Sequence, residues 1–131
     1  FDLDLAELAV NENIALLSYS PLAAGILSGK YLNSAVPEGS RASIKPGLDG
    51  RLTPLTDPPV QAYLDIAAQH GFRPEQMALA FCVQRPFMGS VIVGATSLNQ
   101  LDIALSSSEI KLTKDILDDI QKIYRRYPAP L

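Results

Sequence analysis

Residues 14–31 read IALLSYSPLAAGILSGKY, and this stretch decides how the rest of the sequence is interpreted. It begins with the apolar run 14–18, which is typical of a strand buried on both faces. It continues with a Ser-Pro pair and small residues, which let a backbone approach a ligand closely. It ends near Lys30, a cation suited to hold an anion. Parallel α/β proteins bind ligands where a buried strand ends in such a loop, so the stretch predicts an α/β fold with a site after this strand.

The composition is that of a globular protein able to form a core. Of the 131 residues, 47% are hydrophobic and 19% are charged, and the formal net charge is −3. This charge argues against nucleic acid or an anionic membrane as the main partner. No apolar run approaches the ~20 residues of a membrane span, and acidic residues occupy the place where a signal peptide would be basic. The single Cys82 excludes an intramolecular disulfide and predicts a reducing, cytoplasmic environment.

The rest of the chain predicts helices around a second strand. Asp4 and Glu7 are spaced as in a capping box, which predicts a first helix to about residue 10. Further helices are expected over 59–70, ended by Gly71, and from Pro74, where seven apolar residues in a row predict burial nearly all round. A strand is expected at 90–93. Two strands far apart in sequence and joined by helices are typical of parallel pairing.

Two more helices and one long loop complete the prediction. Ser97 and Gln100 form a second capping box, and the helix that follows is expected to direct Leu98, Leu101 and Leu105 inward. The last helix, 113–127, shows the clearest helical periodicity, with apolar side chains at Ile116, Leu117, Ile120, Ile123 and Tyr124. Residues 32–59 contain five prolines and three glycines without periodicity, and loops of this length are usually lids or binding loops.

Two turns are candidate anion sites, and each can also be explained as a turn that binds no ligand. The segment from Gly25 to Lys30 is not a P-loop, because it has three residues between its glycines and Tyr31 after the lysine. It is either an anion-binding loop or a loop with a solvated lysine. The turn from Gly94 to Ser97 leads from a strand into a capped helix, which suits a phosphate but also occurs in turns that bind nothing.

The two other reactive side chains considered, His70 and Cys82, are expected to have structural roles. His70 lies at a predicted helix C-terminus, where a cation suits the last carbonyls. Cys82 lies in a buried run and is expected to be a core thiol. No metal-ligand cluster, paired carboxylates or nucleophile with its base stands out, so the sequence predicts no catalytic and no metal-binding residue.

Several motifs together resemble the aldo/keto reductase superfamily, in particular its bacterial Tas-like branch and the potassium-channel β-subunit relatives. They are YSPLAAG at 19–25, GKY at 29–31, Ser40-Arg41, and GATSLNQL at 94–101. The likeness spans the chain as far as the tail at 127–130 and covers only the C-terminal part of a family member. It therefore implies one partial domain, 1–131, of a (β/α)8 TIM barrel, with 14–18 and 90–93 as its seventh and eighth strands.

The resemblance also implies NADP(H) as cofactor and assigns residues to it. Tyr19 matches the aromatic residue that stacks on the nicotinamide. The pyrophosphate is expected to lie against Ser20, Pro21, Leu22, Ala24 and Lys30, beneath the long cofactor-side loop 32–59 that brings Arg41 to the cofactor. The turn that takes the adenosine 2′-phosphate matches Gly94, Thr96 and Gln100. This chain departs from the family at Ile103 and Ala104, where a Glu-Asn pair usually grips the adenine, and at Gln100, where many members have arginine.

The family's catalytic Asp, Tyr, Lys and His belong to earlier strands, outside this chain. The resemblance therefore implies the cofactor-binding part of an NADP(H)-dependent oxidoreductase that reduces aldehydes or ketones once the missing N-terminal barrel half is present. The isolated chain is expected to be inactive. A non-catalytic nucleotide-binding or partner-binding module, such as a redox sensor, is the alternative, and an inert truncation product is a third possibility.

Overall fold

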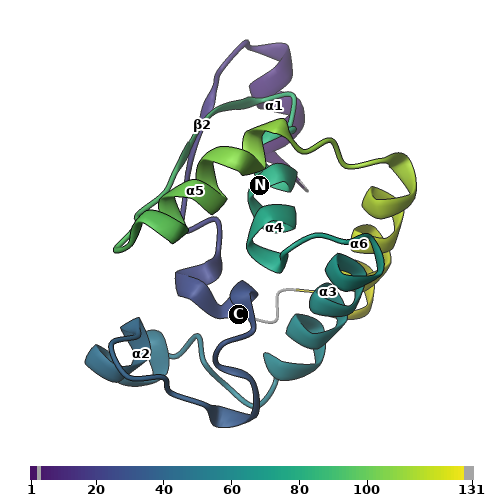
Figure 1. Ribbon diagram of the computed structural model, residues 1–131. Coiled ribbons are helices and arrows are strands. Elements are labelled where there is room, and N and C mark those ends of the chain that lie inside the picture. Colours follow the sequence, from purple (N-terminus) through teal and green to yellow (C-terminus); the bar gives the residue numbers. More distant parts are fainter. Residues whose placement is uncertain (3, 129–131) are drawn as a thin grey trace.

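A computed structural model describes residues 1–2 and 4–128, in which two strands lie among helices (Figure 1). Ala129 and Pro130 of the family-like tail lie outside the described residues, as do Leu3 and Leu131. With 3₁₀ helices labelled η, the elements in order are α1 (Leu5–Asn11), β1 (Leu16–Tyr19), η1 (Ala23–Ser28), η2 (Leu32–Ser34), α2 (Arg41–Ile44), η3 (Pro46–Leu48), α3 (Asp57–Gln69), α4 (Pro74–Val83), β2 (Met88–Ile92), α5 (Leu98–Ser106), η4 (Ser107–Glu109) and α6 (Lys114–Arg126).

The two strands pair in parallel, as the sequence predicts, and each lies within two residues of its expected start. Leu16 pairs with Met88, and Leu17 pairs with Ser90, so β2 has one extra residue, Gly89, at this point. A Cβ at Gly89 would lie 2.8 Å from the Cβ of Ala15. Glycine therefore permits the close approach of the two strands at the irregularity. The pair is an open piece of a parallel α/β sheet, as expected for part of a barrel.

The expectation that the first strand is buried on both faces is wrong for this chain. Its residues alternate, with Leu16 and Ser18 half-buried and Leu17 and Tyr19 exposed at 63% and 73%. On β2, Ile92 is also exposed. A continuous apolar run is typical of parallel sheets with both faces covered. In the described chain, helices cover one face of the pair and leave the other face to solvent.

The larger hydrophobic cluster joins α3, α4 and α6. It contains Ile66 and Ala67 from α3 and Met77 and Ala80 from α4, with Leu112, Ile116, Ile120 and Ile123 from α6 and the segment before it. The periodicity predicted for the last helix is confirmed, since Ile116, Ile120 and Ile123 are its buried residues. The predicted burial of α4 is confirmed in part: Met77, Leu79 and Ala80 are buried and Val83 is exposed, whereas the other residues are half-buried. Figure 1 shows α4 between the sheet and the pair formed by α3 and α6.

A smaller cluster anchors the long loop. Tyr31, Ala42 and Leu48 are buried against Ile26 of η1 and Val60 in the first turn of α3. Within 32–59 the chain forms η2, α2, η3 and the start of α3, so the expected absence of regular structure is wrong for these segments. Short turns of this kind have no helical repeat long enough to detect in sequence. The loop is therefore a packed lobe, seen below η1 in Figure 1.

The predicted inward face of α5 is wrong. Leu98, Leu101 and Leu105 are exposed at 84%, 42% and 65%, whereas Ile103 is buried. Residues 101 and 103 lie on nearly opposite sides of a helix, since each residue turns it by about 100°. Helix α5 packs on α4 through the Ile103 side, where Gln76 Nε2 also donates to Ser106 Oγ at 3.1 Å. The leucine side has no covering element among the described residues.

The exposure of the leucine side of α5 can be tested by replacing leucine with alanine at one buried and one exposed position. Leu79→Ala in α4 removes a side chain that is 3% exposed, and Leu98→Ala removes one that is 84% exposed. We expect Leu79→Ala to lower the unfolding free energy by roughly 2–5 kcal/mol, because it leaves a cavity. Leu98→Ala should change it by less than about 0.5 kcal/mol. Urea unfolding followed by circular dichroism measures both, and equal losses would contradict the placement of α5.

Charge pairs on α6 predict a pH dependence of stability. Asp119 Oδ1 accepts from Lys122 Nζ at 2.7 Å, and Asp119 Oδ2 lies 4.0 Å from His70 Nε2 at the end of α3. The hydrogen bond from Lys122 lowers the pKa of Asp119, with smaller help from the positive charges of Lys122 and His70. A carboxylate with a lowered folded-state pKa stabilises the fold above its unfolded pKa, and this stability is lost as pH falls through the folded-state value.

We therefore expect acidification from neutral pH to about pH 3 to lower the unfolding free energy of Asp119→Asn less than that of the unsubstituted chain. The measurement is the urea midpoint as a function of pH. Asp102→Asn, which changes an exposed carboxylate on α5 without an ion pair among the described residues, is the matched control. Parallel pH curves for the chain and Asp119→Asn would contradict the prediction.

Candidate functional site

The parallel pairing places two turns at one edge of the sheet. Tyr19 and Ile92, the last residues of β1 and β2, are partners in the register. The chain leaves β1 at Ser20 and leaves β2 at Val93, so both turns begin at this edge (Figure 1). The exposed ring of Tyr19 lies beside them. Ligands of parallel α/β folds bind at this edge, so these turns form the candidate site.

The turn after β1 has an unusual backbone. Ser20, Ala23 and Ala24 have φ values of 55°, 48° and 59°, and Gly25 follows at 93°. Ala23 N–H donates to Ser20 C=O at 2.8 Å, and Gly25 N–H donates to Leu22 C=O at 2.9 Å. Left-handed conformations at residues other than glycine cost about 1–3 kcal/mol each and concentrate at ligand sites. The strain in this small-residue turn therefore supports a binding role for it.

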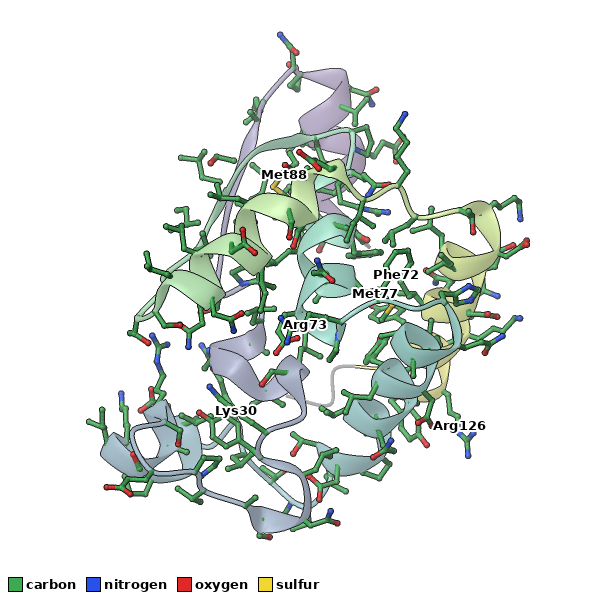
Figure 2. The ribbon with its side chains drawn as sticks, in the orientation of Figure 1. Lys30, Phe72, Arg73, Met77, Met88 and Arg126 are labelled. Atoms are coloured by element: carbon green, nitrogen blue, oxygen red, sulfur yellow. The ribbon has the colours of Figure 1, made fainter. Side chains whose placement is uncertain are left out.

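Lys30 folds back over the same turn. A Cβ at Gly25 would lie 3.0 Å from both Cε and Nζ of Lys30. The ammonium nitrogen also lies 5.1 Å from the centre of the Tyr31 ring. No carboxylate among the described residues is within ion-pair distance of Lys30. Figure 2 shows Lys30 between η1 and the lobe that contains α2. The cation thus lies over the turn at Gly25 and is available to an anion.

Arg41 is the first residue of α2 and also lacks an ion-pair partner among the described residues. Its helix is held by Tyr31, which is 2% exposed and whose hydroxyl accepts from Ala42 N–H at 3.4 Å. Because Tyr31 adjoins Lys30 in sequence, one buried ring connects the segments of both cations. A bis-anionic group such as a pyrophosphate matches two unpaired cations of this kind.

The turn after β2 is closed by side-chain hydrogen bonds. Ser97 is the N-cap of α5, and its Oγ accepts from Gln100 N–H at 3.2 Å. Gln100 Oε1 accepts from Thr96 N–H at 2.9 Å and from the Thr96 hydroxyl at 3.1 Å. Gly94 lies in open space just before. A hollow of about 350 Å³ lies over this turn, lined by Ala95, Thr96, Ser97, Leu98 and Leu101.

The ten sequence-predicted residues lie in three parts of the chain. Tyr19, Ser20, Pro21, Leu22, Ala24 and Lys30 belong to β1 and the turn after it, Gly94, Thr96 and Gln100 belong to the turn after β2, and Arg41 belongs to the α2 lobe. The first two groups meet at the sheet edge through the strand register. Their assignment to particular parts of a cofactor stays a prediction.

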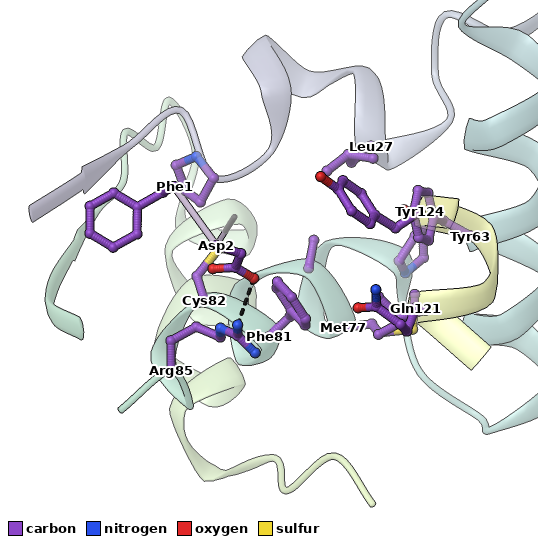
Figure 3. Close-up of a pocket in the computed structure, with 14 residues that line it drawn as sticks. Phe1, Asp2, Leu27, Tyr63, Met77, Phe81, Cys82, Arg85, Gln121 and Tyr124 are labelled. Carbon is purple, nitrogen blue, oxygen red and sulfur yellow. Dashed lines mark hydrogen bonds and ion pairs between the residues drawn. The ribbon is translucent and has the colours of Figure 1, made fainter. Parts of the chain in front are cut away.

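A larger cavity that the sequence does not predict lies beside α4. It has a volume of about 590 Å³ and a mostly apolar lining, with Phe81, Cys82 and Arg85 along one wall (Figure 3). Arg85 Nη2 lies 2.6 Å from Asp2 Oδ2, and Tyr63 and Tyr124 lie at the other end. The lining comes from separate segments, including the first two residues, η1, α3, α4 and α6. No spacing along the sequence relates these segments, so no motif could have revealed the cavity.

Burial controls the ionisable groups of this cavity. It raises the pKa of the Cys82 thiol, with a further rise from the charge of Asp2, and it raises the pKa of Tyr63 next to Tyr124. The thiol therefore stays protonated at neutral pH, which disfavours a role as nucleophile. Cys82 is half-buried at the cavity wall, in partial agreement with the predicted core thiol. His70 caps the C-terminus of α3, as predicted, and Gly71 follows with a φ of 74°.

Neither a metal site nor a membrane-spanning helix is present in the part of the chain that the structure describes. No group of three or more His, Cys, Asp and Glu side chains there is arranged to hold a metal ion. None of the helices in that part of the chain has the length and apolar character needed to cross a membrane.

Comparison with known proteins identifies the class. The model of the aldo/keto reductase family matches residues 2–125. The chain is 41% identical to protein tas of Escherichia coli (strain K12) over 132 residues, which cover 99% of this chain and 38% of that protein. It is also similar to a probable voltage-gated potassium channel subunit beta of Arabidopsis thaliana, at 32% identity over 92% of this chain and 38% of the relative. A putative channel subunit beta of Schizosaccharomyces pombe is 36% identical over the whole chain and 40% of the relative.

The chain belongs to the aldo/keto reductase family. It spans about two fifths of the length of these relatives. The predicted family resemblance is thereby confirmed, and the open two-stranded sheet is consistent with part of the family's barrel.

The position of Lys30 over Gly25 gives a prediction for this site. Gly25→Ala places a Cβ 3.0 Å from the Lys30 ammonium and should displace it. Gly39→Ala is the matched control, because Gly39 has a similar positive φ but no neighbour within 4 Å. Both substitutions should lower the unfolding free energy by about 1–2 kcal/mol. We expect the Tyr31 ring to shift the ε-methylene protons of Lys30 upfield in the unsubstituted chain, and these protons to move toward their usual NMR frequency in Gly25→Ala alone. An unchanged shift would contradict the folded-back position.

Proposed function

We propose that this chain is the cofactor-binding part of an aldo/keto reductase and that its cofactor is NADP(H). The observation that supports this most strongly is the meeting of two anion-compatible turns at one sheet edge, one with the unpaired Lys30 and one at the N-terminus of α5. Family membership adds to it, because members of this family use nicotinamide cofactors. The unpaired cations and the open space over Thr96 fit such a group.

Each part of the cofactor has a suitable partner in this chain. The exposed face of Tyr19 suits stacking on the nicotinamide. Lys30 and Arg41 would hold the pyrophosphate, and the small residues of the turn at 20–25 would let the backbone approach it closely. The hollow over residues 95–98 and Leu101, which includes Thr96 and adjoins Gly94 and Gln100 in sequence, suits the adenosine with its 2′-phosphate. When bound, the nicotinamide supplies a hydride to an aldehyde or ketone; this chain's residues orient the cofactor.

The rest of the reaction requires groups from outside this chain. We propose that an N-terminal barrel half supplies the acid–base residues and covers the open sheet face. The exposed apolar side chains are consistent with such a partner, since a monomer rarely leaves a large apolar area to solvent. They include Leu17 and Tyr19 on β1, Ile92 on β2, and Leu98 and Leu105 on α5. We expect the whole protein to act in the cytoplasm and the isolated chain to reduce no carbonyl compound.

A second candidate function is a non-catalytic nucleotide-binding module, such as a redox sensor. It is favoured by two relatives that are named as potassium channel subunits beta. Both candidate functions use the same binding site, but only the enzyme would reduce a carbonyl substrate. Cofactor binding with NADPH-dependent carbonyl reduction, after addition of the N-terminal half of an aldo/keto reductase such as the tas protein, supports the enzyme. Binding and a stable complex without reduction support the module.

The binding site is tested by titrating NADPH into the chain and following the nicotinamide fluorescence. We expect saturable binding that Lys30→Met and Arg41→Met each weaken about tenfold, since a charge-assisted hydrogen bond contributes about 1.5–3 kcal/mol. Lys111→Met removes an exposed cation elsewhere and is the matched control. No binding by a folded chain, or equal weakening by all three substitutions, would overturn the proposed function.

A further inference from the structure

The cavity beside α4 has the size and shape of a small-molecule site. One side of α4 forms a wall, and the residues that line it there follow helical spacing: Pro74, Met77, Ala78, Phe81 and Cys82. From the first to the last of them the helix rises about 12 Å, so the cavity is elongated. Its volume is about 590 Å³, and sites for small molecules typically measure about 300–1,000 Å³.

The walls of this cavity differ from those of the candidate cofactor site. The turn after β1 contributes Pro21 and Leu27. Lys30, Arg41 and residues 94–100 are not among the described residues that line the cavity. The cavity is therefore separate from the two unpaired cations and from the N-terminus of α5.

The cavity is open to solvent and leaves apolar surface without contacts. Tyr63, Phe81, Cys82 and Tyr124 line it and are half-buried. Protein interiors are packed as densely as organic crystals, so a hollow of this size deprives its lining of dispersion contacts. An apolar molecule that fills the space would supply these contacts, and the opening lets such a molecule enter.

The charged side chains of the cavity neutralise each other. They are Asp2 and Arg85, whose Oδ2 and Nη2 lie 2.6 Å apart at one end of the cavity (Figure 3). The Arg85 guanidinium also lies 5.1 Å from the centre of the Phe81 ring and 5.4 Å from that of Phe87. A charged ligand would lose hydration here without meeting a free opposite charge. The cavity therefore favours a neutral ligand.

The other end of the cavity supplies aromatic surface and hydroxyl groups. Tyr63 and Tyr124 lie there (Figure 3). Burial raises the pKa of Tyr63, with a further rise from Tyr124, so the Tyr63 hydroxyl stays protonated at neutral pH and donates a hydrogen bond. The rings of both tyrosines and of Phe81 suit packing against another aromatic ring. An aromatic molecule with a carbonyl or ether oxygen matches this combination.

We propose that the cavity beside α4 is a second ligand site, which binds a neutral polycyclic aromatic molecule with a carbonyl or ether oxygen. The rings of the ligand pack along the Ala78 and Phe81 side of α4, and its oxygen accepts from the hydroxyls of Tyr63 and Tyr124. The site goes beyond the proposed function, because it uses neither the cations nor the helix terminus assigned to the cofactor.

The first test uses Nile red, a neutral polycyclic dye with a ring carbonyl whose fluorescence rises in apolar surroundings. We expect saturable binding with one dye per chain. Ala78→Trp should weaken it by more than about tenfold, because an indole in the cavity takes the space of the dye. Ala68→Trp makes the same change at an exposed position of α3 and should leave it unchanged. Equal effects of the two substitutions would overturn the proposal.

Substitutions that keep the cavity volume test the hydroxyl groups. Tyr63→Phe and Tyr124→Phe should each weaken Nile red binding about fivefold, since each removes one neutral hydrogen-bond donor. Tyr127→Phe, outside the cavity lining, is the matched control. Unchanged binding in both cavity variants would contradict the assigned oxygen acceptor. Leu98→Ala tests the exposed side of α5, and a loss of dye binding in this variant would place the dye there and overturn the proposal.

The neutral character of the ligand is tested with 8-anilinonaphthalene-1-sulfonate, an aromatic anion. We expect it to displace Nile red at least about tenfold more weakly than unlabelled Nile red analogues without charge, because its sulfonate finds no free cation in the cavity. Equal or tighter binding of the anion would refute the neutral class.

Cys82 provides a direct report on the cavity, because it lines the cavity and is the only cysteine of the chain. Its alkylation by N-ethylmaleimide is followed by the mass of the intact chain. With Nile red at ten times its Kd, we expect alkylation to slow about tenfold, since only the unoccupied cavity reacts. Unchanged alkylation would overturn the proposal.

NADPH separates this inference from the proposed function. We expect NADPH neither to slow the alkylation of Cys82 nor to displace Nile red. If it does both, the cavity belongs to the cofactor site and the inference fails. If Nile red protects Cys82 in a chain that binds no nicotinamide cofactor, the proposed function fails and the second site stands.

Discussion

The parallel pairing of Tyr19 with Ile92 is the constraint on which the candidate site depends. Because both strands run in the same direction, the turn that leaves β1 and the turn that leaves β2 begin at one edge of the sheet. An antiparallel pair would have placed them at opposite ends. Gly89 permits this register, since it allows the strands to approach beside Ala15 where β2 has an extra residue. The anion-compatible groups are therefore brought together by backbone hydrogen bonds and not by contacts between the turns.

Helices and strand positions could be predicted from sequence because their signals are local. The 3.6-residue period of α6 and the glycine after α3 act within a few residues, and both predictions are confirmed. Burial could not be predicted in the same way. The apolar pattern of β1 and the leucines of α5 suit a complete fold with both faces covered, whereas the described chain covers one face. Among the described residues, no element covers these side chains.

The same distinction applies to the candidate site, of which the local features could be predicted from sequence and the side-chain contacts could not. Its positions could be predicted because the motifs around Tyr19, Lys30 and Gly94 keep a fixed order along the chain. The folding of Lys30 over Gly25, the bond from Ala42 N–H to Tyr31 and the occupation of Thr96 by Gln100 could not, because they depend on side-chain rotamers and on left-handed backbone angles at residues such as Ala23 and Ala24.

The distance along the chain between the two strands has a consequence for folding. Leu17 and Ser90 pair across 73 residues, whereas α3 and α4 are joined by a short turn at Gly71 and share a core. Closing a long loop costs entropy before its contacts form, so the helical core assembles first and the strands join last. The sheet is then the least protected unit of the chain and the first to open. We therefore expect the edge that presents the two candidate turns to form in a late and readily reversed step of folding.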